Sequence, residues 1–464
     1  MIALEFNVLL LMNKLTIPLL LIAAITMVSC NGPSKVSSGA NNTSTPLSDD
    51  SLLTLVQYQT FQYFWEGAEP VSGLARERIH IDGEYPQNDK DVVTIGGSGF
   101  GLMALLVGVE RGFITREQAV ERFDRAIGFL ERVERFHGAW SHWLDGPTGA
   151  VKPFSNNDNG GDLVETAFMA QALICVREYF QRGNIDEKRL AARADNLWKT
   201  IEWDWYRQDG QHVLYWHWSP TAGWAENHPI RGYDECLVTY ILAASSPTYG
   251  VPAEVYHEGW ARGGAIISTA KRYGHPLILK HNVPDSNGVG PLFWSHYSYL
   301  GLDPRGLKDN YADYWKVNRN QALVHRDYAI ENPKGYKGYG KQAWGFTASY
   351  SVDGYSAHNP DNDLGVISPT AALSSFPYTP EYSMDVIRYL YDELGDKVWG
   401  KYGFYDAYSE TDNWYPKRYL AIDQGPIPVM IENHRTGLLW KLFMGAPEIK
   451  DGLRKLGFEC GVRR

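Results

Sequence analysis

Two carboxylates stand three residues apart in the segment Asn-Gly-Gly-Asp-Leu-Val-Glu-Thr-Ala-Phe, which covers residues 159–168. Asp162 and Glu165 fall where an apolar helical run begins, and residues three apart share one face of a helix. A second doublet, Asp234 and Glu235, opens another apolar run after a tryptophan-rich segment. Cleavage of a glycosidic bond uses two carboxyl groups that flank the bond. The repetition therefore suggests helix ends that converge on an acidic cleft.

Each of these acids also has a purely structural explanation. An acidic side chain in the first turn of a helix caps its free N–H groups and interacts favourably with the helix dipole. Glu165 and Glu235 are harder to explain in this way because apolar residues follow each of them at once. A carboxylate on a mostly buried helix needs a partner or a function, and burial raises its pKa toward the range of a general acid.

If the reaction inverts the anomeric carbon, the two working carboxyls lie about 6.5–9.5 Å apart, which leaves room for the attacking water. Two acids in one helical turn are too close to fill both roles, so the acid and the base should come from different segments. We therefore predict Glu235 as the general acid, and Asp162 and Glu165 as residues that position or activate water.

A further set of residues is predicted to bind the substrate, because loops rich in Gly, Asn and Asp carry many aromatic side chains. Aromatic rings stack on the apolar faces of sugars while polar neighbours bind the hydroxyl groups. The chain has 16 Trp and 29 Tyr, although packing between helices explains the larger part of them. Arg231 could either hold Asp234 ionised or bind a sugar hydroxyl. The predicted substrate-binding residues are Trp224, His228, Arg231, Asp234, Trp294, Trp344, Tyr355, His358, Asp423, Gln424 and Glu432.

Several other chemistries find little support in the sequence. No Cys/His cluster with zinc spacing is present, so we expect no metal and no cofactor. The chain lacks a GxSxG elbow, and Cys175 lies within an apolar helical run, which argues against a nucleophilic serine or cysteine. The net charge of −10 argues against nucleic acid and anionic membrane surfaces as partners.

The elements that must position these acids are helices that alternate in character. Nearly apolar runs are each followed later by amphipathic ones, as if an inner ring of helices were wrapped by an outer ring. This pattern predicts an all-α (α/α)6 toroid, a barrel of helical hairpins, with long loops over the active-site face. The apolar runs start at Gly97, Asp162, Tyr233 and Gln424, and the amphipathic ones at Thr115, Asp186, Glu254 and Pro447; two of these helices are expected over 254–273 and 424–443.

The N-terminal residues 1–30 are typical of an export signal. A short basic start precedes an apolar run, and Met27-Val28-Ser29-Cys30 resembles a bacterial lipobox, in which the cysteine is lipidated. A plain signal peptide or an uncleaved anchor is the alternative, but the apolar run is short for a span of about twenty residues. Residues 31–50, rich in Ser, Asn, Thr and Gly, are predicted to form a flexible tether. We expect an exported lipoprotein, periplasmic or at the cell surface, attached to the membrane only through a lipid on Cys30.

Residues 51–464 are predicted to form a single domain, and we expect a monomer. No Pro/Gly/Ser-rich break divides this segment, and its length allows a large core.

Long blocks of this domain match a known pattern. They read Gly-Gly-Asp-Leu-Val-Glu-Thr-Ala-Phe-Met, Ile-Arg-Gly-Tyr-Asp-Glu-Cys-Leu-Val, Ala-Trp-Gly-Phe-Thr-Ala-Ser, Asp-Gly-Tyr-Ser-Ala-His, Ser-Pro-Thr-Ala-Ala-Leu-Ser-Ser-Phe-Pro-Tyr-Thr-Pro and Leu-Ala-Ile-Asp-Gln-Gly-Pro-Ile-Pro-Val-Met-Ile-Glu-Asn. From Leu52 to Glu459 the chain resembles the bacterial glucoamylase-like domain, which includes the β-1,2-glucanases of glycoside hydrolase family 144. The motifs of true glucoamylases, which share the toroid, are not evident.

The resemblance implies an (α/α)6 barrel that hydrolyses β-1,2-glucan with inversion, without a metal. By motif, Asp162 and Glu165 match the acidic pair of the first block, and either Asp234 or Glu235 is the counterpart in the second. Endo action and release of sophorose from chain ends both stay open. Two other functions compete: a polysaccharide lyase on the same toroid, which an acid-rich site suits poorly, and a non-catalytic glycan-binding lipoprotein, for which aromatic loops suffice.

Overall fold

The computed structural model describes residues 46–282 and 289–461. The chain divides after Pro46, and the unit from Leu47 onward contains the helices and strands given below. Its first helix begins at Asp49, just before the predicted domain start at residue 51, because the Ser48 side chain accepts a hydrogen bond from the backbone N–H of Ser51 and caps the helix. The predicted signal segment, with Cys30, lies outside the described residues. Among the residues that are described, no helix has both the length and the apolarity needed to cross a membrane.

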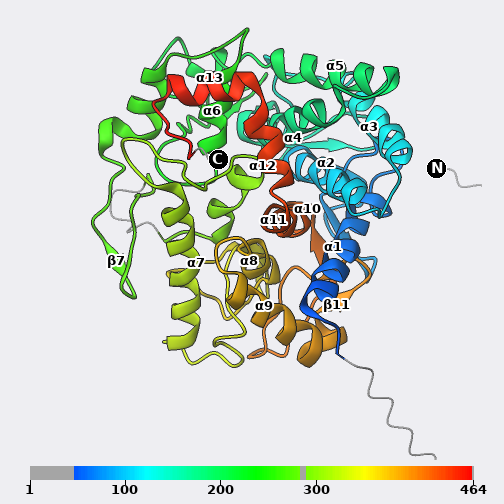
Figure 1. The fold of residues 1–464 in the computed structure, drawn as a ribbon, viewed down its shortest axis with the longest axis vertical. Helices are drawn as coiled ribbons and strands as arrows, with labels where there is room; N and C mark the ends of the chain where they lie inside the picture. Colours follow the sequence, from blue (N-terminus) through cyan, green and yellow to red (C-terminus); the bar gives the residue numbers. More distant parts are fainter. Residues whose placement is uncertain (1–45, 283–288, 462–464) are drawn as a thin grey trace, which may run out of the picture. The chain divides into compact units, whose positions relative to one another are not determined.

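Buried and half-exposed helices alternate along the chain, which is the arrangement of an (α/α)6 toroid (Figure 1). The inner positions are taken by α2 (Ile95–Glu110), α4 (Leu163–Phe180), α6 (Leu237–Ser245), the 3₁₀ turns η4 (Leu292–Ser295) and η5 (Tyr297–Leu300), α8 (Pro369–Ser374), and α10 (Ala421–Gln424) with α11 (Pro426–Arg435). The outer positions are taken by α1 (Asp49–Trp65), α3 (Arg116–Leu130), α5 (Ile185–Lys199), the π-helical turn η2 (Val255–Trp260), α7 (Tyr314–Glu331) and α9 (Pro380–Arg388). The last helices, α12 (Leu438–Gly445) and α13 (Pro447–Lys455), pack on α4 and α6 respectively.

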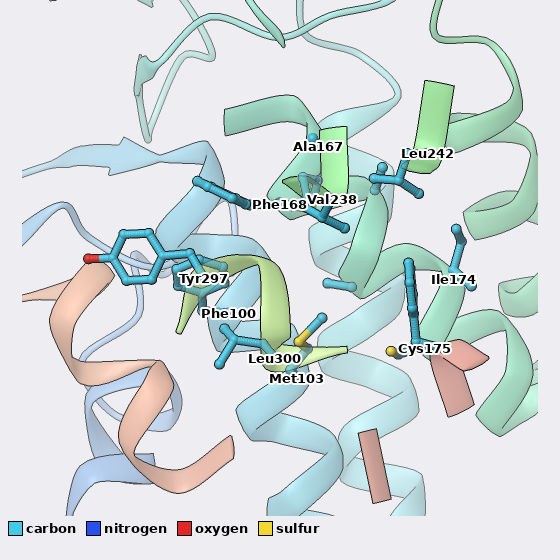
Figure 2. Packing of buried hydrophobic residues seen from close by; sticks show 14 of the residues in the cluster. Phe100, Met103, Ala167, Phe168, Ile174, Cys175, Val238, Leu242, Tyr297 and Leu300 are labelled. Carbon is cyan, nitrogen blue, oxygen red and sulfur yellow. The ribbon is translucent and has the colours of Figure 1, made fainter. Parts of the chain in front are cut away.

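The inner helices are buried because they are apolar on every side. Residues 95–108 of α2 are all buried, and α4 is buried along almost its whole length. Figure 2 shows how Phe100 and Met103 of α2 lie beside Phe168 of α4 and Tyr297 of η5, with the Tyr297 hydroxyl pointing away from this apolar cluster. The ring closes where α11 packs against both α1 and α2.

Two predicted helices are shorter than expected because glycines interrupt them. The segment 254–273 is helical only to Gly264, where Gly263 and Gly264 have φ values of 61° and 95°. A hairpin of β7 (Lys271–Arg272) and β8 (His275–Pro276) follows. The segment 424–443 is divided among α10, α11 and α12, and Gly437, with φ 71°, separates the last two.

Short antiparallel strands join the loops on the face where the inner helices begin. β2 (Val92–Thr94), β5 (Gly161–Asp162) and β13 (Arg418–Leu420) run directly into α2, α4 and α10. Their partners are β3 (Trp143–Asp145), β6 (His217–Trp218) and β1 (Arg78–His80), and β3 also pairs with β4 (Val151–Lys152). Two hairpins complete the set: β9 (Ala348–Ser351) with β10 (Gly354–Ala357), and β11 (Trp399–Gly400) with β12 (Gly403–Phe404). The strands therefore fix the first turns of three inner helices.

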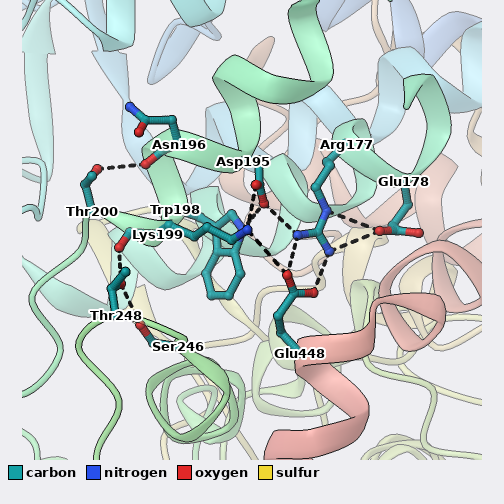
Figure 3. Close-up of polar contacts among 10 residues, drawn as sticks. All are labelled: Arg177, Glu178, Asp195, Asn196, Trp198, Lys199, Thr200, Ser246, Thr248 and Glu448. Atoms are coloured by element: carbon teal, nitrogen blue, oxygen red, sulfur yellow. Dashed lines mark hydrogen bonds and ion pairs between the residues drawn. The ribbon is translucent and has the colours of Figure 1, made fainter. Parts of the chain in front are cut away.

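A charged network joins α4, α5 and α13 near the C-terminal end of α4 (Figure 3). Arg177 donates to Asp195 at 2.6 Å and to both carboxylate oxygens of Glu448, at 2.8 and 2.9 Å. Lys199 and the Trp198 ring N–H also donate to Asp195. The Arg177 side chain is only 8% exposed, so this network holds the three helices together away from the loops.

Candidate active site

A cavity of about 320 Å³ opens where α2, α4 and α6 begin, and we call it the cleft. Three carboxylates reach it, from Glu77, Glu165 and Glu235. Most of its wall is aromatic or apolar, and the lining residues are Glu77, Arg78, Gln87, Thr94, His142, Trp143, Phe154, Glu165, Phe168, Trp216, Glu235, Phe293, Tyr297, Ala348, Tyr355, Leu420 and Ile422. Aromatic walls with a few converging acids are suited to a neutral, hydroxyl-rich ligand.

Glu165 projects from the first turn of α4 into the first turn of α2. Its Oε2 atom accepts a hydrogen bond from the backbone N–H of Gly96 at 2.6 Å and lies 3.4 Å from the hydroxyl of Thr94. A Cβ atom on Gly96 would lie 2.6 Å from Glu165 Oε2, so only glycine leaves room for the carboxylate. Burial raises the pKa of Glu165 to about 7; the nearby His142 opposes this shift and Asp162 adds to it.

Asp162 is fully buried and does not line the cleft. It caps α4, because its Oδ1 accepts from the backbone N–H groups of Val164 and Glu165 at 3.0 and 2.9 Å. Its Oδ2 accepts from Nδ1 of His142 at 3.0 Å, and His142 does line the cleft. Asp162 can therefore act on a substrate only through Glu165 and His142.

The charges of this group favour an ionised Asp162 beside a protonated His142. Burial works against the charge of His142, but the carboxylates of Glu165 and Asp162 outweigh it and raise the pKa of His142 to about 10. Burial would also raise the pKa of Asp162, but the hydrogen bond from His142 and the charge of His217 lower it instead. His142 is thus a cation that is held next to the Glu165 carboxyl.

Two clusters among the described residues have the donor atoms for a cation. The ligand atoms of His142, Asp158 and Asp162 lie within 4.8 Å of one another, as do those of Asp234, Glu235 and Cys236. In the first cluster the His142 and Asp162 atoms are already joined by a hydrogen bond. His217 approaches the same group, with Nδ1 3.4 Å from Asp158 and 3.8 Å from Asp162.

Glu235 enters the cleft just before α6 begins, and its neighbour Asp234 is buried behind it. The side chain of Asp234 accepts from the backbone N–H of Cys236 at 2.9 Å, and the hydroxyl of Ser298 in η5 donates to the carbonyl of Glu235. Burial raises the pKa of Glu235 well above its usual value, and Asp234 adds to the shift. Burial also raises the pKa of Asp234 to about 7. The carboxyl of Glu235 is therefore held in its protonated form more strongly than that of Glu165.

Asp423 lies one side chain behind the cleft wall. It is 1% exposed, and the hydroxyl of Tyr297, which lines the cleft, donates to its Oδ1 at 3.5 Å. Burial raises the pKa of Asp423 well above its usual value, with the carboxylate of Asp406 adding to the shift. Asp406 itself accepts from the backbone N–H of Tyr350 at 2.9 Å. Asp423 and Asp406 thus form a second pair of neighbouring acids, which is joined to the cleft wall through Tyr297.

Three of the predicted binding residues lie at or beside the cleft. Tyr355 of β10 lines it with 60% of its surface exposed. His228 stacks on Trp216, a cleft residue, with ring centroids 5.1 Å apart. Trp294 is half-buried, follows the cleft residue Phe293 in the chain and stacks on His281. Arg231 is half-buried. Burial lowers the pKa of Arg262, and the positive charge of Arg231 is the second cause of this shift.

Five of the residues predicted to bind the substrate are buried almost completely, namely Asp423, described above, and the four that follow. Trp344 packs in a second apolar cluster, which is separate from the core around α2 and α4. His358 forms a hydrogen bond with Ser349, and the Gln424 amide donates to the carbonyl of Phe404. Glu432 pairs with Arg111 at 2.6 Å, at the opposite end of α2 from Gly96. Their exposed fractions of 0–1% leave no surface for a sugar. Trp224 lines a different cavity, described below.

The sequence reasoning also missed residues that the cleft contains. Glu77, Thr94, His142, Trp216 and Tyr297 line it without having been selected. Trp216 and Tyr297 belong to segments that are rich in aromatic residues. This high aromatic content is the feature of the sequence that could have identified them as cleft residues. Thr94 is the last residue of the short strand β2 and His142 directly precedes β3, and no periodic pattern marks either of them.

Comparison with known proteins places this geometry in a family. The family model for the glucoamylase group, Glycoamylase, matches residues 227–447. An endo-β-1,2-glucanase from Chitinophaga pinensis, solved in complex with sophorotriose and glucose, is 65% identical, with a TM-score of 0.88 over 89% of this chain and 99% of that one. An exo-β-1,2-glucooligosaccharide sophorohydrolase from Parabacteroides distasonis is 45% identical over 89% of this chain. The present chain spans 59% of that relative's length.

A more distant structure supports the fold. An endo-β-1,2-glucanase from Talaromyces funiculosus is 11% identical and has a TM-score of 0.62 over 88% of this chain, which shows the shared toroid alone. The 65% identity with the Chitinophaga enzyme extends over nearly all of that chain. The chain therefore belongs to the glucoamylase-like family of β-1,2-glucanases, glycoside hydrolase family 144.

Proposed function

We propose that this protein hydrolyses β-1,2-glucan with inversion of configuration at the anomeric carbon. The observation that supports the proposal most directly is the presence in one cleft of two carboxyls with different proton affinities, Glu165 from the first turn of α4 and Glu235 from the residues just before α6. The names of the relatives supply the linkage, since both the Chitinophaga and the Parabacteroides proteins are described by β-1,2-glucan or its oligosaccharides.

In this mechanism Glu235 donates its proton to the glycosidic oxygen as the bond to the anomeric carbon breaks. A water molecule attacks that carbon from the opposite side, and Glu165 accepts the proton that the water releases. The hydrogen bond from Gly96 holds the Glu165 carboxyl in place, and the charge of His142 favours its ionised form. Asp162 is a positioning residue, because it fixes both His142 and the start of α4.

The protein's place in the cell is part of the same proposal. A lipobox-like Met27-Val28-Ser29-Cys30 supports an exported lipoprotein that is anchored by a lipid on Cys30. Such a location gives the cleft access to glucans outside the cytoplasm.

Product analysis with purified protein tests the activity. Incubation with β-1,2-, β-1,3- and α-1,4-glucans, followed by NMR of the freshly released reducing ends, should show cleavage of the β-1,2-glucan alone and an inverted anomer. A retained anomer would contradict the mechanism, and intact β-1,2-glucan would contradict the function.

The roles are tested by Glu235→Gln and Glu165→Gln, each expected to lower kcat by at least about 100-fold, the lower range for loss of acid–base catalysis. Glu77→Gln is the matched control, because it removes a carboxyl from the same cleft. A smaller loss is expected from Glu77→Gln. Near-normal rates in folded Glu235→Gln and Glu165→Gln would remove both assignments.

A further inference from the structure

A second cavity of about 320 Å³, which we call the outer pocket, lies outside the cleft. Three aromatic residues, Trp205, Trp224 and Tyr249, line it together with three acids, Glu202, Asp204 and Asp209. Trp205 is 41% exposed and Tyr249 is 37% exposed, although large aromatic side chains are mostly buried in folded proteins. Its volume lies in the range of small-molecule sites, about 300–1,000 Å³.

The rings of the outer pocket are held in place by other parts of the protein. One face of Trp205 stacks on His137, with ring centroids 3.7 Å apart, and Glu202 bonds the His137 ring at 3.0 Å. The exposed surface of Trp205 therefore belongs to its other face and its edge. Trp224 stands 6.4 Å from Trp205 and packs against the buried Tyr206. Rings fixed in advance lose little conformational freedom when a ligand stacks on them.

The polar groups of the outer pocket limit what it can bind. Its lining, taken over the described residues, includes three carboxylates and no Lys or Arg, so an anionic polymer would be repelled. Carboxylates accept hydrogen bonds from hydroxyl groups, and the aromatic rings offer stacking surface. Asp204 bonds the backbone N–H of Trp205 through Oδ1. A neutral, polyhydroxylated ligand matches both kinds of group.

The outer pocket is connected to the cleft through one strand and one loop. Trp216 lines the cleft, and Trp218, two residues further on, contacts Trp205 with ring centroids 6.3 Å apart. The loop that follows places Trp224 in the outer pocket and then returns His228 onto Trp216. The segment from Trp216 to Trp224 thus runs from the cleft wall to the outer pocket.

We propose that the outer pocket is a second glucan-binding site, which holds another part of a β-1,2-glucan polymer while the cleft acts on the bond to be cleaved. The proposal rests on the proposed function for the identity of the polymer. It assigns Trp205, Trp224 and Tyr249 to stacking on sugar rings, and Asp204 and Asp209 to their hydroxyl groups.

The test compares long and short substrates with Trp205→Ala and Tyr249→Ala in the full chain. We expect each variant to raise KM for polymeric β-1,2-glucan by about 2- to 10-fold, the range for loss of one stacking contact, and to migrate faster in gels that contain the polymer. KM and kcat for a β-1,2-linked tetrasaccharide should stay at the wild-type values. Tyr58→Ala, which removes a 42% exposed ring from α1, is the matched control. It should leave KM and kcat unchanged for both substrates.

Unchanged polymer KM and unchanged gel migration in both variants would overturn the outer pocket as a glucan site. If Trp205→Ala also slows cleavage of the tetrasaccharide, Tyr249→Ala decides, because Tyr249 belongs to a separate loop after α6. A wild-type protein that neither cleaves nor binds β-1,2-glucan contradicts the proposed function, whereas cleavage by the wild type with unaltered variants contradicts the second site alone.

Discussion

Replacement of Gly96 by alanine probes the contact between α2 and the Glu165 carboxylate with a single methyl group. The new Cβ would lie 2.6 Å from Glu165 Oε2 and 2.9 Å from its Cδ atom, so the carboxylate must move. Movement breaks the 2.6 Å hydrogen bond from the Gly96 N–H. Alanine itself favours a helix by about 0.5–1 kcal/mol relative to glycine, which offsets part of the cost in stability.

The size of the effect follows from the hydrogen bond that is lost. A hydrogen bond to a charged group contributes about 1.5–3 kcal/mol, which corresponds to roughly 10- to 150-fold in rate if the contact is needed in the transition state. The same hydrogen bond lowers the pKa of Glu165, so its loss should raise that pKa above the value of about 7 in the wild type. The acidic limb of the pH–rate profile should therefore move to higher pH in Gly96→Ala.

We would measure kcat on β-1,2-glucan from pH 5 to pH 9 together with thermal unfolding. The two measurements distinguish an effect on the active site from an effect on the stability of the fold. Gly108→Ala is the matched control, because a Cβ there would lie 2.4 Å from the Phe61 ring near the other end of the same helix. It should lower stability by about 1–3 kcal/mol through overpacking without a shift of the pH profile. The reasoning fails if folded Gly96→Ala retains the wild-type rate and pH profile.

Three further outcomes are expected. The kcat of the wild type should rise with pH through about 7, because Glu165 must lose its proton to act as the base, and a flat profile between pH 5 and pH 8 would contradict this. The pKa of Glu235 is higher in the folded state than in the unfolded state, so the stability of the wild type falls as pH rises above about 4.5. The variant Glu235→Gln lacks this titration and should unfold roughly 2 °C or more above the wild type at pH 7.5, but not at pH 4. Scanning calorimetry at the two pH values checks this. Arg177→Met should lower the free energy of unfolding in urea by about 3–5 kcal/mol with kcat unchanged, whereas Arg189→Met, which breaks an exposed pair with Asp186, should lower it by about 1 kcal/mol or less.

The sequence was most informative where apolar runs are long. The runs that contain α2 and α4 are apolar on all sides, which is why their inner position in a toroid could be predicted. Acids where such apolar runs begin were therefore expected to converge at one end of the barrel, and Glu165 and Glu235 do reach one cleft. The inner turns η4 and η5 escaped prediction because each has four residues, too few for a helical period.

Partners distant in the sequence account for the errors at single residues. Glu432 follows Asp423 in a block rich in functional candidates, yet it is paired with Arg111, which lies 321 residues earlier. No local pattern encodes that ion pair. His142 was missed for the converse reason: its importance arises from Asp162 and Glu165, which the chain brings to it only when β3 and β5 are in place.

Closure of the helical ring affects the stage of synthesis and folding at which the active site forms. Gly96, Glu165, Glu235 and Asp423 come from four inner helices or their entrances, and the last of them precedes α11, the helix that packs back on α1 and α2. A chain that is still being synthesised can form α2 and α4, but it lacks the wall that carries Tyr297 and Asp423. Joining helices more than 300 residues apart also costs chain entropy, which local helix formation does not. The cleft is thus completed at the end of folding, and a nascent chain with most of its helices formed is not yet an enzyme.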